Sequence, residues 1–463
     1  MTLLATATFP VIDPATLEVI DEVVDGTPDD ARAAVDAAAA AFPAWSRKTP
    51  RDRAETLRRS FELMVERSEE LVALICAENG KSQADARAEV AYAAEFFRWF
   101  SEEAVRSDGD YSVAPASGAR TIVTHQPVGV AALVTPWNFP AAMATRKIAP
   151  ALAAGCTVVL KPASETPLTA IAVARILAEA GVPDGVVNVV ATTDPAGVVT
   201  TWLTDERVRK ISFTGSTGVG RTLLRQAADR VLNASMELGG NAPFVVTADA
   251  DLDAAVAGAM VAKFRNGGQA CTAANRFYVH ADVADAFIER FGAAIEALHV
   301  GAAADAETEV GPLISATAVE TVGGLVDAAV AAGAKLSHRA KTPERGWFYP
   351  PTLLADVPPD AEILGQEIFG PVAPVVTWTD EAELLRLVNG TELGLSAYVY
   401  AGRLQDALRL AEQMEAGMVG INRGIVSDPA APFGGMKQSG LGREGARDGL
   451  REFQETRYFS VDL

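Results

Sequence analysis

The chain has 463 residues, of which 49% are hydrophobic and 22% are charged, and this supplies enough apolar material for two or three globular domains. Its formal net charge of -20 disfavours nucleic acid and anionic membranes as partners, and no stretch of about 18 apolar residues predicts a membrane span or a secretory signal. Three widely spaced cysteines and four separated histidines predict neither a disulfide framework nor a metal site, so we expect a metal-free cytoplasmic protein.

The N-terminal part of the chain carries the start signals of helices. Thr27 can cap a helix that begins at Pro28, and two aspartates follow at the positive end of the helix dipole. A second capped start follows at Thr49, and helical periodicity continues to about Phe100. Residues 106–127 are polar, glycine-rich and β-branched, which predicts a hairpin or an extended arm.

From Gly129 onward, short apolar runs alternate with amphipathic helices, which is typical of parallel βαβ units. The runs VVLKP, VVNVV and KISF lack a polar alternation, so we expect strands that helices bury on both faces. This pattern predicts a nucleotide-binding sheet. A second α/β block follows from about Gly240, and the β-rich C-terminal segment is too short to be a domain, so it should add to another sheet.

A cysteine and a carboxylate suggest a covalent enzyme. Cys271 lies in the glycine-rich segment RNGGQACTAAN, and Glu237 lies upstream in MELGGN. A thiol is a strong nucleophile only as the thiolate, which is favoured by exposed backbone amides, little apolar cover and a nearby base. Residues 266–269 supply such surroundings. Taken alone, Cys271 could equally be a small buried hydrophobic residue.

Three further segments could bind a ligand where strands end. In FTGSTGVG, at residues 213–220, the glycines allow a tight turn and Ser216 can face a pyrophosphate, although the spacing is not GxGxxG. Lys161 ends an apolar run at the expected carboxyl end of a strand, where it is either a ligand contact or a solvated lysine. Asn138, between the bulky residues of PWNFP, could bind a developing oxyanion or simply stabilise the turn.

Six motifs occur in one order across nearly the whole chain, namely PWNFP, KPASETP, FTGSTGVG, MELGGN, GGQAC and QEIFGPV. Together they resemble the NAD(P)-dependent aldehyde dehydrogenase superfamily over about residues 10–460. The resemblance implies an α/β fold and a homodimer or homotetramer. The implied division is a Rossmann-type cofactor domain at residues 1–105 and 128–239, a catalytic domain at 240–433, and a small β oligomerisation arm at 106–127 and 446–463.

The resemblance also implies roles for the three residues nearest the chemistry. Cys271 would attack the aldehyde carbonyl, pass a hydride to the nicotinamide and be left as a thioester. Asn138 and the backbone amide of Cys271 would hold the oxyanion. Glu237 would take a proton from the water that hydrolyses the thioester, a role that requires a partly buried carboxylate with a raised pKa. Its presence disfavours the related branch that transfers the acyl group to coenzyme A.

For the cofactor, the resemblance assigns Lys161 and Glu367 to the riboses and Ser216 to the pyrophosphate, and it places Trp137 and Phe369 around the nicotinamide. The other cofactor positions implied by the same turns are Thr135, Pro136, Ser164, Gly215 and Gly218.

The residue three positions after Lys161 bears on the choice of cofactor. Many NAD-using relatives have a glutamate there, whose carboxylate would repel a 2′-phosphate. This chain has Ser164, whose hydroxyl can bind a phosphate beside Lys161. We therefore expect NADP to be preferred, while the adjacent Glu165 leaves NAD as an alternative.

Two arginines bear on the substrate. Arg146 follows Asn138 by eight residues and Arg265 precedes Cys271 by six, so both can border a substrate channel and pair with a carboxylate, although each taken alone is more often exposed. The surrounding segments resemble succinate-semialdehyde dehydrogenases in particular. In these relatives the matching arginines, with the serine that matches Ser427, grip the distal carboxylate of the substrate.

The expected reaction is the oxidation of succinate semialdehyde to succinate with NADP and water. Glutarate semialdehyde, another ω-oxo acid or a broader range of aldehydes remains an alternative, because one methylene changes selectivity by only ~1–3 kcal/mol. A cysteine hydrolase or acyl-transfer enzyme without redox chemistry would leave the nucleotide-binding half unexplained, and an inactive homologue would not need Cys271, Glu237 and Asn138 together.

The remaining cysteines suggest no redox role. Some relatives carry a second cysteine two residues after the nucleophile, where this chain has Ala273, so a disulfide lock at that position is excluded. Cys156 is flanked by apolar residues and Cys76 lies within a predicted helix, so we expect both to be core residues.

Overall fold

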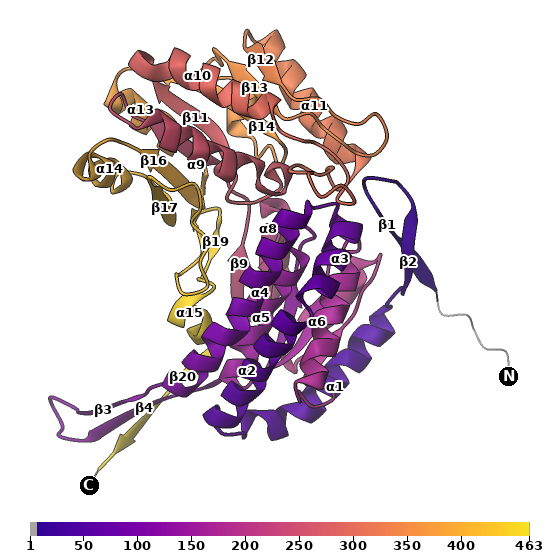
Figure 1. Ribbon diagram of the computed structural model, residues 1–463. Helices are drawn as coiled ribbons and strands as arrows, with labels where there is room; N and C mark the ends of the chain where they lie inside the picture. The colour runs from indigo at the N-terminus through magenta and orange to yellow at the C-terminus, as the bar shows by residue number, and fades with distance from the viewer. Residues whose placement is uncertain (1–6, 463) are drawn as a thin grey trace.

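The computed structural model describes residues 7–462, which form two α/β parts and a projecting β arm (Figure 1). The lower part in Figure 1 contains the N-terminal helices, and the upper part contains most of the second half of the chain. The predicted domain ranges also include residues 1–6 and 463, which lie outside the described residues. No helix in the described part is long and apolar enough to span a membrane.

A six-stranded sheet forms the centre of the lower part. From one edge to the other its strands are β19 (Gly440–Leu441), β9 (Asn233–Glu237), β8 (Val208–Thr214), β5 (Val130–Val134), β6 (Thr157–Lys161) and β7 (Val187–Val189). All neighbours except β19 and β9 are parallel, so the predicted βαβ units are confirmed. The chain runs outward from β5 to β7 and then returns to the other side with β8 and β9. Such a reversal creates a crevice at the carboxyl ends of β5 and β8, where open α/β sheets bind ligands.

Eight helices accompany this sheet. They are α1 (Pro28–Ser46), α2 (Pro50–Glu66), α3 (Ser68–Asn79), α4 (Gln83–Glu103), α5 (Pro140–Ala154), α6 (Pro167–Glu179), α7 (Pro195–Thr204) and α8 (Thr217–Ala228). The predicted starts are confirmed, because the Thr27 side chain accepts a hydrogen bond from the Asp30 amide and Thr49 caps α2 in the same way.

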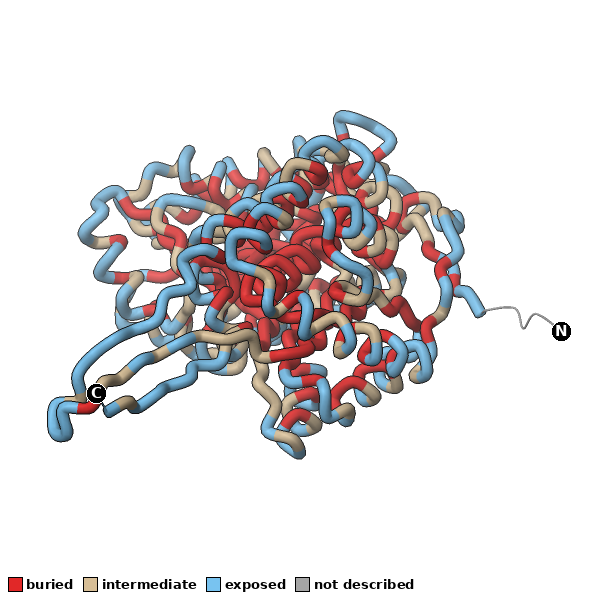
Figure 2. The backbone as a smooth tube through the Cα atoms, turned by 90° about the horizontal axis from the view of Figure 1, so that it is seen from below, coloured by how far each residue is buried: buried red, intermediate tan, exposed pale blue. Residues whose placement is uncertain are grey.

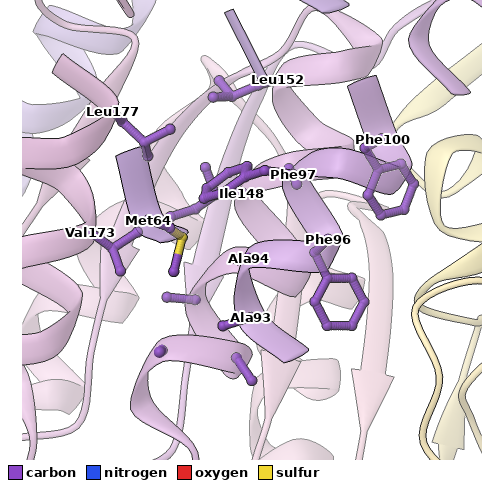
Figure 3. Close-up of a cluster of buried hydrophobic side chains, with 14 of the residues drawn as sticks. Met64, Ala93, Ala94, Phe96, Phe97, Phe100, Ile148, Leu152, Val173 and Leu177 are labelled. Atoms are coloured by element: carbon purple, nitrogen blue, oxygen red, sulfur yellow. The ribbon is translucent and has the colours of Figure 1, made fainter. Parts of the chain in front are cut away.

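The largest hydrophobic core lies among α2, α4, α5 and α6. Figure 3 shows part of it, with Phe96, Phe97 and Phe100 of α4 and with Ile148 and Leu152 of α5 in the same cluster. All residues of α5 are buried, including Arg146 and Lys147. Because an unpaired buried charge is costly, these two cations require anionic or polar partners inside the protein.

The upper part is built on a seven-stranded sheet. Its strands, in spatial order, are β12 (Lys335–Arg339), β13 (Thr352–Ala355), β14 (Val372–Trp378), β11 (Ala274–His280), β10 (Ala242–Val246), β16 (Ser396–Tyr400) and β17 (Met418–Ile421). Only β12 and β13 pair antiparallel. The later helices are α9 (Leu252–Phe264), α10 (Ala281–Glu296), α11 (Ala316–Ala331), α12 (Glu362–Gly365), α13 (Glu381–Asn389), α14 (Leu404–Ala411) and α15 (Ala446–Arg451).

The projecting arm joins two distant segments of the chain. The hairpin of β3 (Asp110–Val113) and β4 (Arg120–Pro127) pairs antiparallel with the C-terminal strand β20 (Gln454–Val461). Both the predicted hairpin and the addition of the C-terminal segment to another sheet are therefore confirmed. Figure 2 shows that the arm extends away from the buried centre and is largely exposed.

Shorter elements complete the structure. They are the hairpin of β1 (Thr8–Ile12) and β2 (Val19–Val24), the pair β15 (Leu393–Gly394) and β18 (Met436–Lys437), and the 3-10 helices η1 (Ala104–Arg106) and η2 (Arg265–Gly268).

Candidate active site

Two adjoining cavities lie at the carboxyl ends of β5 and β8. The cysteine cavity, which contains Cys271, has a volume of about 380 Å³, and the lysine cavity, which contains Lys161, has a volume of about 600 Å³. Pro136, Thr214 and Gly215 line both cavities. The cavities therefore meet at the reversal in strand order, and each is large enough for a small ligand.

The cavities bring together all but one of the residues selected from the sequence. The cysteine cavity is lined by Pro136, Trp137, Asn138, Arg146, Gly215, Ser216, Arg265, Cys271, Glu367, Phe369 and Ser427. The lysine cavity is lined by Thr135, Pro136, Lys161, Ser164, Gly215 and Gly218. Glu237 lines neither cavity.

Cys271 is more covered than the sequence suggested. It lies between η2 and β11, where it packs against Leu395, Met418 and Phe433. Burial raises the pKa of the Cys271 thiol to about 12, although Arg146 opposes this shift. The thiol thus has more apolar cover than the sequence suggested, because side chains around β16 and β17 pack against it, but Cys271 is only partly buried and lines the cavity. At neutral pH the resting thiol is protonated, so nucleophilic attack requires a base.

The loop before Cys271 has an unusual backbone. Asn266, Gly267 and Gly268 all have positive φ, at 52°, 60° and 76°. Glycine adopts this conformation readily, whereas Asn266 must be held in it. The backbone N–H of Asn266 donates to the Asp85 carboxylate at 2.7 Å, and its side chain donates to the backbone carbonyl of Asn138 at 2.9 Å. The loop is thereby fixed against the turn that carries Asn138.

The side chain of Asn138 can still donate into the cavity. Its Nδ2 donates one hydrogen bond to the carbonyl of Gln269 at 3.0 Å, and the second N–H is left for another acceptor. Lys81 donates to the backbone carbonyl of Asn138 at 2.9 Å, so that the turn is held from two sides. This arrangement fits an oxyanion-binding amide.

A buried ion pair underlies the same turn. The side chains of Lys81 and Glu89 are fully buried and paired with each other. Glu89 also accepts hydrogen bonds from the amides of Ala141 and Ala142, at 2.9 and 3.2 Å, in the first turn of α5. Its negative charge therefore lies at the positive end of the helix. Burial lowers the pKa of Lys81, and Glu89 opposes this shift.

Glu237 lies at the end of β9, behind the wall of the cysteine cavity. It is 3% exposed, and its Oε2 has no hydrogen-bond partner within residues 7–462. Burial and the neighbouring Glu444 raise its pKa well above the ordinary value. The direction of the shift suits a general base, and Glu237 is near enough to Cys271 for its charge to help raise the pKa of the thiol.

The two arginines of the cysteine cavity differ in their partners. Arg146 is ion-paired with Glu444 at 2.5 Å, and its guanidinium lies 4.1 Å from the centre of the Phe433 ring. Although burial alone would lower the pKa of Arg146, Glu444 raises it. Arg265 packs over Phe139 at 5.2 Å and has no hydrogen-bond or ion-pair partner among the described residues. Arg265 is therefore the cation that is free to bind an anion.

The lysine cavity fits the phosphates and ribose of a dinucleotide. Lys161 is buried, and burial lowers its pKa while Glu165 opposes the shift. Ser216 caps α8, so the first amides of that helix point towards the cavity. A side chain at Gly218 would meet no atom within 4 Å, which leaves the helix start open. The hydroxyl of Ser164 donates to Glu165 at 3.2 Å, so it is not free until this contact changes.

Glu367 and two aromatic rings lie where the cavities meet the upper part. Glu367 accepts a hydrogen bond from the Gly240 amide at 3.0 Å, and burial raises its pKa to about 7. The rings of Trp137 and Phe369 pack edge to face at 5.4 Å. A Cβ at Gly240 would lie 2.1 Å from the carbonyl oxygen of Cys271, so only glycine allows MELGGN to pass this close to the cysteine loop.

Comparison with known proteins identifies the family to which the chain belongs. A model of the Aldehyde dehydrogenase family matches residues 4–459. The chain belongs to this family. It is 55% identical to the succinate-semialdehyde dehydrogenase of Paenarthrobacter nicotinovorans, over 95% of this chain and 98% of the relative. It is 48% identical to the glutarate-semialdehyde dehydrogenase of Pseudomonas putida, over 98% of this chain and 95% of the relative.

Solved structures agree with the assignment to the aldehyde dehydrogenase family. The crystal structure of an E. coli NADP-dependent enzyme superposes with a TM-score of 0.97 at 47% identity, covering 99% of this chain and 95% of that one. A succinate-semialdehyde dehydrogenase from Burkholderia pseudomallei gives the same TM-score at 46% identity, covering 99% and 95%. The predicted aldehyde dehydrogenase fold is thus confirmed.

Several residues of this aldehyde dehydrogenase site were missed by the sequence analysis. Lys81 and Glu89 hold the turn of Asn138, and Glu444 is ion-paired with both Arg146 and the buried Lys147. None of these contacts has a local signal, because Lys147 and Glu444 are separated by 297 positions and Lys81 and Asn138 by 57. These partner residues could be anticipated only from the general rule that a buried cation requires an anionic partner.

Proposed function

We propose that the protein oxidises succinate semialdehyde to succinate with reduction of NADP. The observation that carries this proposal is Arg265, which lines the same cavity as Cys271 and has no anionic partner in the described part of the chain. A small carboxylate that extends from the reacting aldehyde could occupy that position, with Ser427 as a second donor. The names of the relatives support the same substrate class, and the Pseudomonas putida relative keeps glutarate semialdehyde as the alternative.

In the proposed reaction, the sulfur of Cys271 bonds to the aldehyde carbon as its thiol proton passes to Glu237. The amide of Asn138 and the backbone N–H of Cys271 then hold the negative oxygen. NADP, held by Lys161, Ser216 and Glu367, would supply the acceptor for the hydride that leaves the substrate carbon. After the thiol proton has left Glu237 for solvent, Glu237 takes a proton from water, whose oxygen adds to the thioester carbon. The C–S bond then breaks, the leaving sulfur of Cys271 regains a proton from Glu237, and the carboxylic acid departs.

The lysine cavity would bind the adenosine half of the cofactor. Lys161 and the first amides of α8 supply positive electrostatic potential for phosphate groups. Ser164 lacks the negative charge that would repel a 2′-phosphate, whereas Glu165 beside it keeps NAD as a second cofactor. An E. coli succinate-semialdehyde dehydrogenase named for NADP is 48% identical over 98% of this chain.

The projecting arm would join copies of the chain into a homodimer or homotetramer. Its strands expose large apolar side chains, with Tyr111 at 65%, Tyr458 at 60% and Phe459 at 43%. Such side chains on a projecting sheet are costly to leave in water.

We also propose that residues 1–105 together with 128–239 act as the cofactor domain, and that residues 240–433 act as the catalytic domain. The three free cysteines fit a reducing compartment such as the cytoplasm.

The test compares succinate semialdehyde with butanal, which has the same number of carbons but ends in a methyl group. The wild-type kcat/KM, followed by the absorbance of reduced nicotinamide with NADP and with NAD, should favour the semialdehyde by about 100-fold. Arg265→Ala should remove most of this preference by raising the KM for the semialdehyde, and leave butanal nearly unchanged. Equal kcat/KM for both aldehydes in the wild type would refute the substrate, and ester cleavage without nicotinamide reduction would favour a hydrolase.

A further inference from the structure

Tyr92 is a polar residue of the cysteine cavity that neither the sequence motifs nor the proposed reaction uses. It lies on α4 and lines the cavity together with Arg146 and Arg265. Its hydroxyl is buried, and although Arg146 beside it can donate to the phenol oxygen, the O–H itself has no acceptor within residues 7–462. Buried tyrosine hydroxyls usually have a partner, because leaving one unpaired costs free energy. An unpaired hydroxyl in a cavity therefore indicates a ligand atom.

The position of Tyr92 is rigid. Its ring contacts Phe96 edge to face at 4.9 Å. Phe96 belongs to the hydrophobic core shown in Figure 3, together with Phe97 and Phe100 from the same helix. The hydroxyl is thus held by a packed helix rather than by a loop, which is the condition for a side chain that selects a ligand by geometry.

The hydroxyl is a neutral donor beside cations. Burial raises the pKa of Tyr92, and the nearby Arg146 partly opposes this shift. The phenol therefore keeps its proton at neutral pH and can donate it in a hydrogen bond. Arg146 itself is paired with Glu444, whereas neither the O–H of Tyr92 nor the guanidinium of Arg265 has an accepting partner within residues 7–462.

We propose that the Tyr92 hydroxyl donates a hydrogen bond to the distal carboxylate of the substrate and so determines specificity. This inference rests on the proposed function. A carboxylate has two oxygens that accept about four hydrogen bonds, more than Arg265 and Ser427 saturate. An aldehyde that ends in a methyl group would leave the hydroxyl unpaired, so Tyr92 favours the acidic substrate and penalises the neutral one.

Tyr92→Phe removes only the oxygen and keeps the ring in place. We expect the KM for succinate semialdehyde to rise about tenfold, with kcat and the KM for butanal nearly unchanged. Succinate, used as a competitive inhibitor of butanal oxidation, should lose about tenfold in affinity as well. The matched control is Tyr349→Phe, which removes a buried hydroxyl near Arg339 outside both cavities and should alter neither substrate.

The results of these measurements distinguish a failure of the Tyr92 proposal from a failure of the proposed function. A wild type that does not prefer the semialdehyde over butanal contradicts the proposed function. A wild type with that preference, together with a Tyr92→Phe variant whose KM and succinate affinity are unchanged, overturns the role of Tyr92 alone. Equal losses with the semialdehyde and butanal would also overturn it, since a merely structural residue affects both substrates alike.

Discussion

The cysteine cavity and the lysine cavity share three residues, yet they are assembled differently. The lysine cavity is lined by separate segments, and in those at 161–165 and 213–226 a strand end is followed directly by a short turn towards a helix. The cysteine cavity depends on charges buried far apart in the chain, such as Glu89 below Asn138 and Glu444 beside Arg146. Local motifs therefore suffice for a cofactor site, whereas the chemical site exists only after the two parts have packed.

Cys271→Ser should separate the chemical step from cofactor binding. We expect aldehyde oxidation to fall by at least ~10⁴-fold, because a hydroxyl without a strong base is a far weaker nucleophile. The Kd for NADPH, measured by its fluorescence, should stay within about twofold, since the lysine cavity is untouched. A parallel loss of NADPH binding would mean that the two cavities are not independent.

The second prediction concerns the buried pair below Asn138. Glu89→Gln leaves Lys81 as an unpaired buried cation, and the free energy of unfolding should fall by about 3–5 kcal/mol in denaturant titrations. As a control, Glu381→Gln breaks an exposed pair with Arg409 and should cost ~1 kcal/mol or less. Similar losses in both variants would show that the charge of Glu89 is not what holds the turn.

Glu78 is a buried carboxylate that has no cation partner within residues 7–462. Glu78 accepts hydrogen bonds from the amides of Leu168 and Thr169, at 2.7 and 2.9 Å, at the start of α6. Burial raises its pKa from 4.5 to about 7. Between these values the folded state keeps a proton that the unfolded state releases, so stability should fall as the pH rises through this window.

The stability loss from Glu78 should not exceed about 1.4 kcal/mol per pH unit, the limit for one proton. Unfolding titrations between about pH 5 and pH 7 would measure it. Glu78→Gln should flatten this slope, whereas Glu70→Gln, which changes an exposed carboxylate on the same helix, should leave it intact. An unchanged slope in Glu78→Gln would assign it to other groups.

The difference between local and long-range contacts also explains which features could be predicted from the sequence. The caps at Thr27 and Thr49, the parallel strands and the FTGSTGVG turn could be predicted, because each is set by residues within a few positions of one another. Cys271 and Asn138 could be selected by their motifs. The sequence could not reveal that apolar side chains pack against Cys271 and that its pKa is raised, or that Arg146 is ion-paired with Glu444. These properties arise from tertiary contacts, for which a single sequence carries no spacing signal.

The smallest expected effect tests whether the lysine cavity distinguishes the two cofactors. Ser164→Glu places a second carboxylate beside Glu165, at the position where the 2′-phosphate of NADP should lie near Lys161. We expect kcat/KM for NADP to fall about tenfold and that for NAD to stay nearly constant, because only NADP carries the repelled phosphate. Ser337→Glu, an exposed site on β12, controls for the added net charge.

If Ser164→Glu lowered kcat/KM for NADP and for NAD equally, the new side chain would obstruct the cavity rather than repel the phosphate. Added salt distinguishes the same two causes, since it screens a repulsion between partly exposed charges but leaves a steric block unchanged.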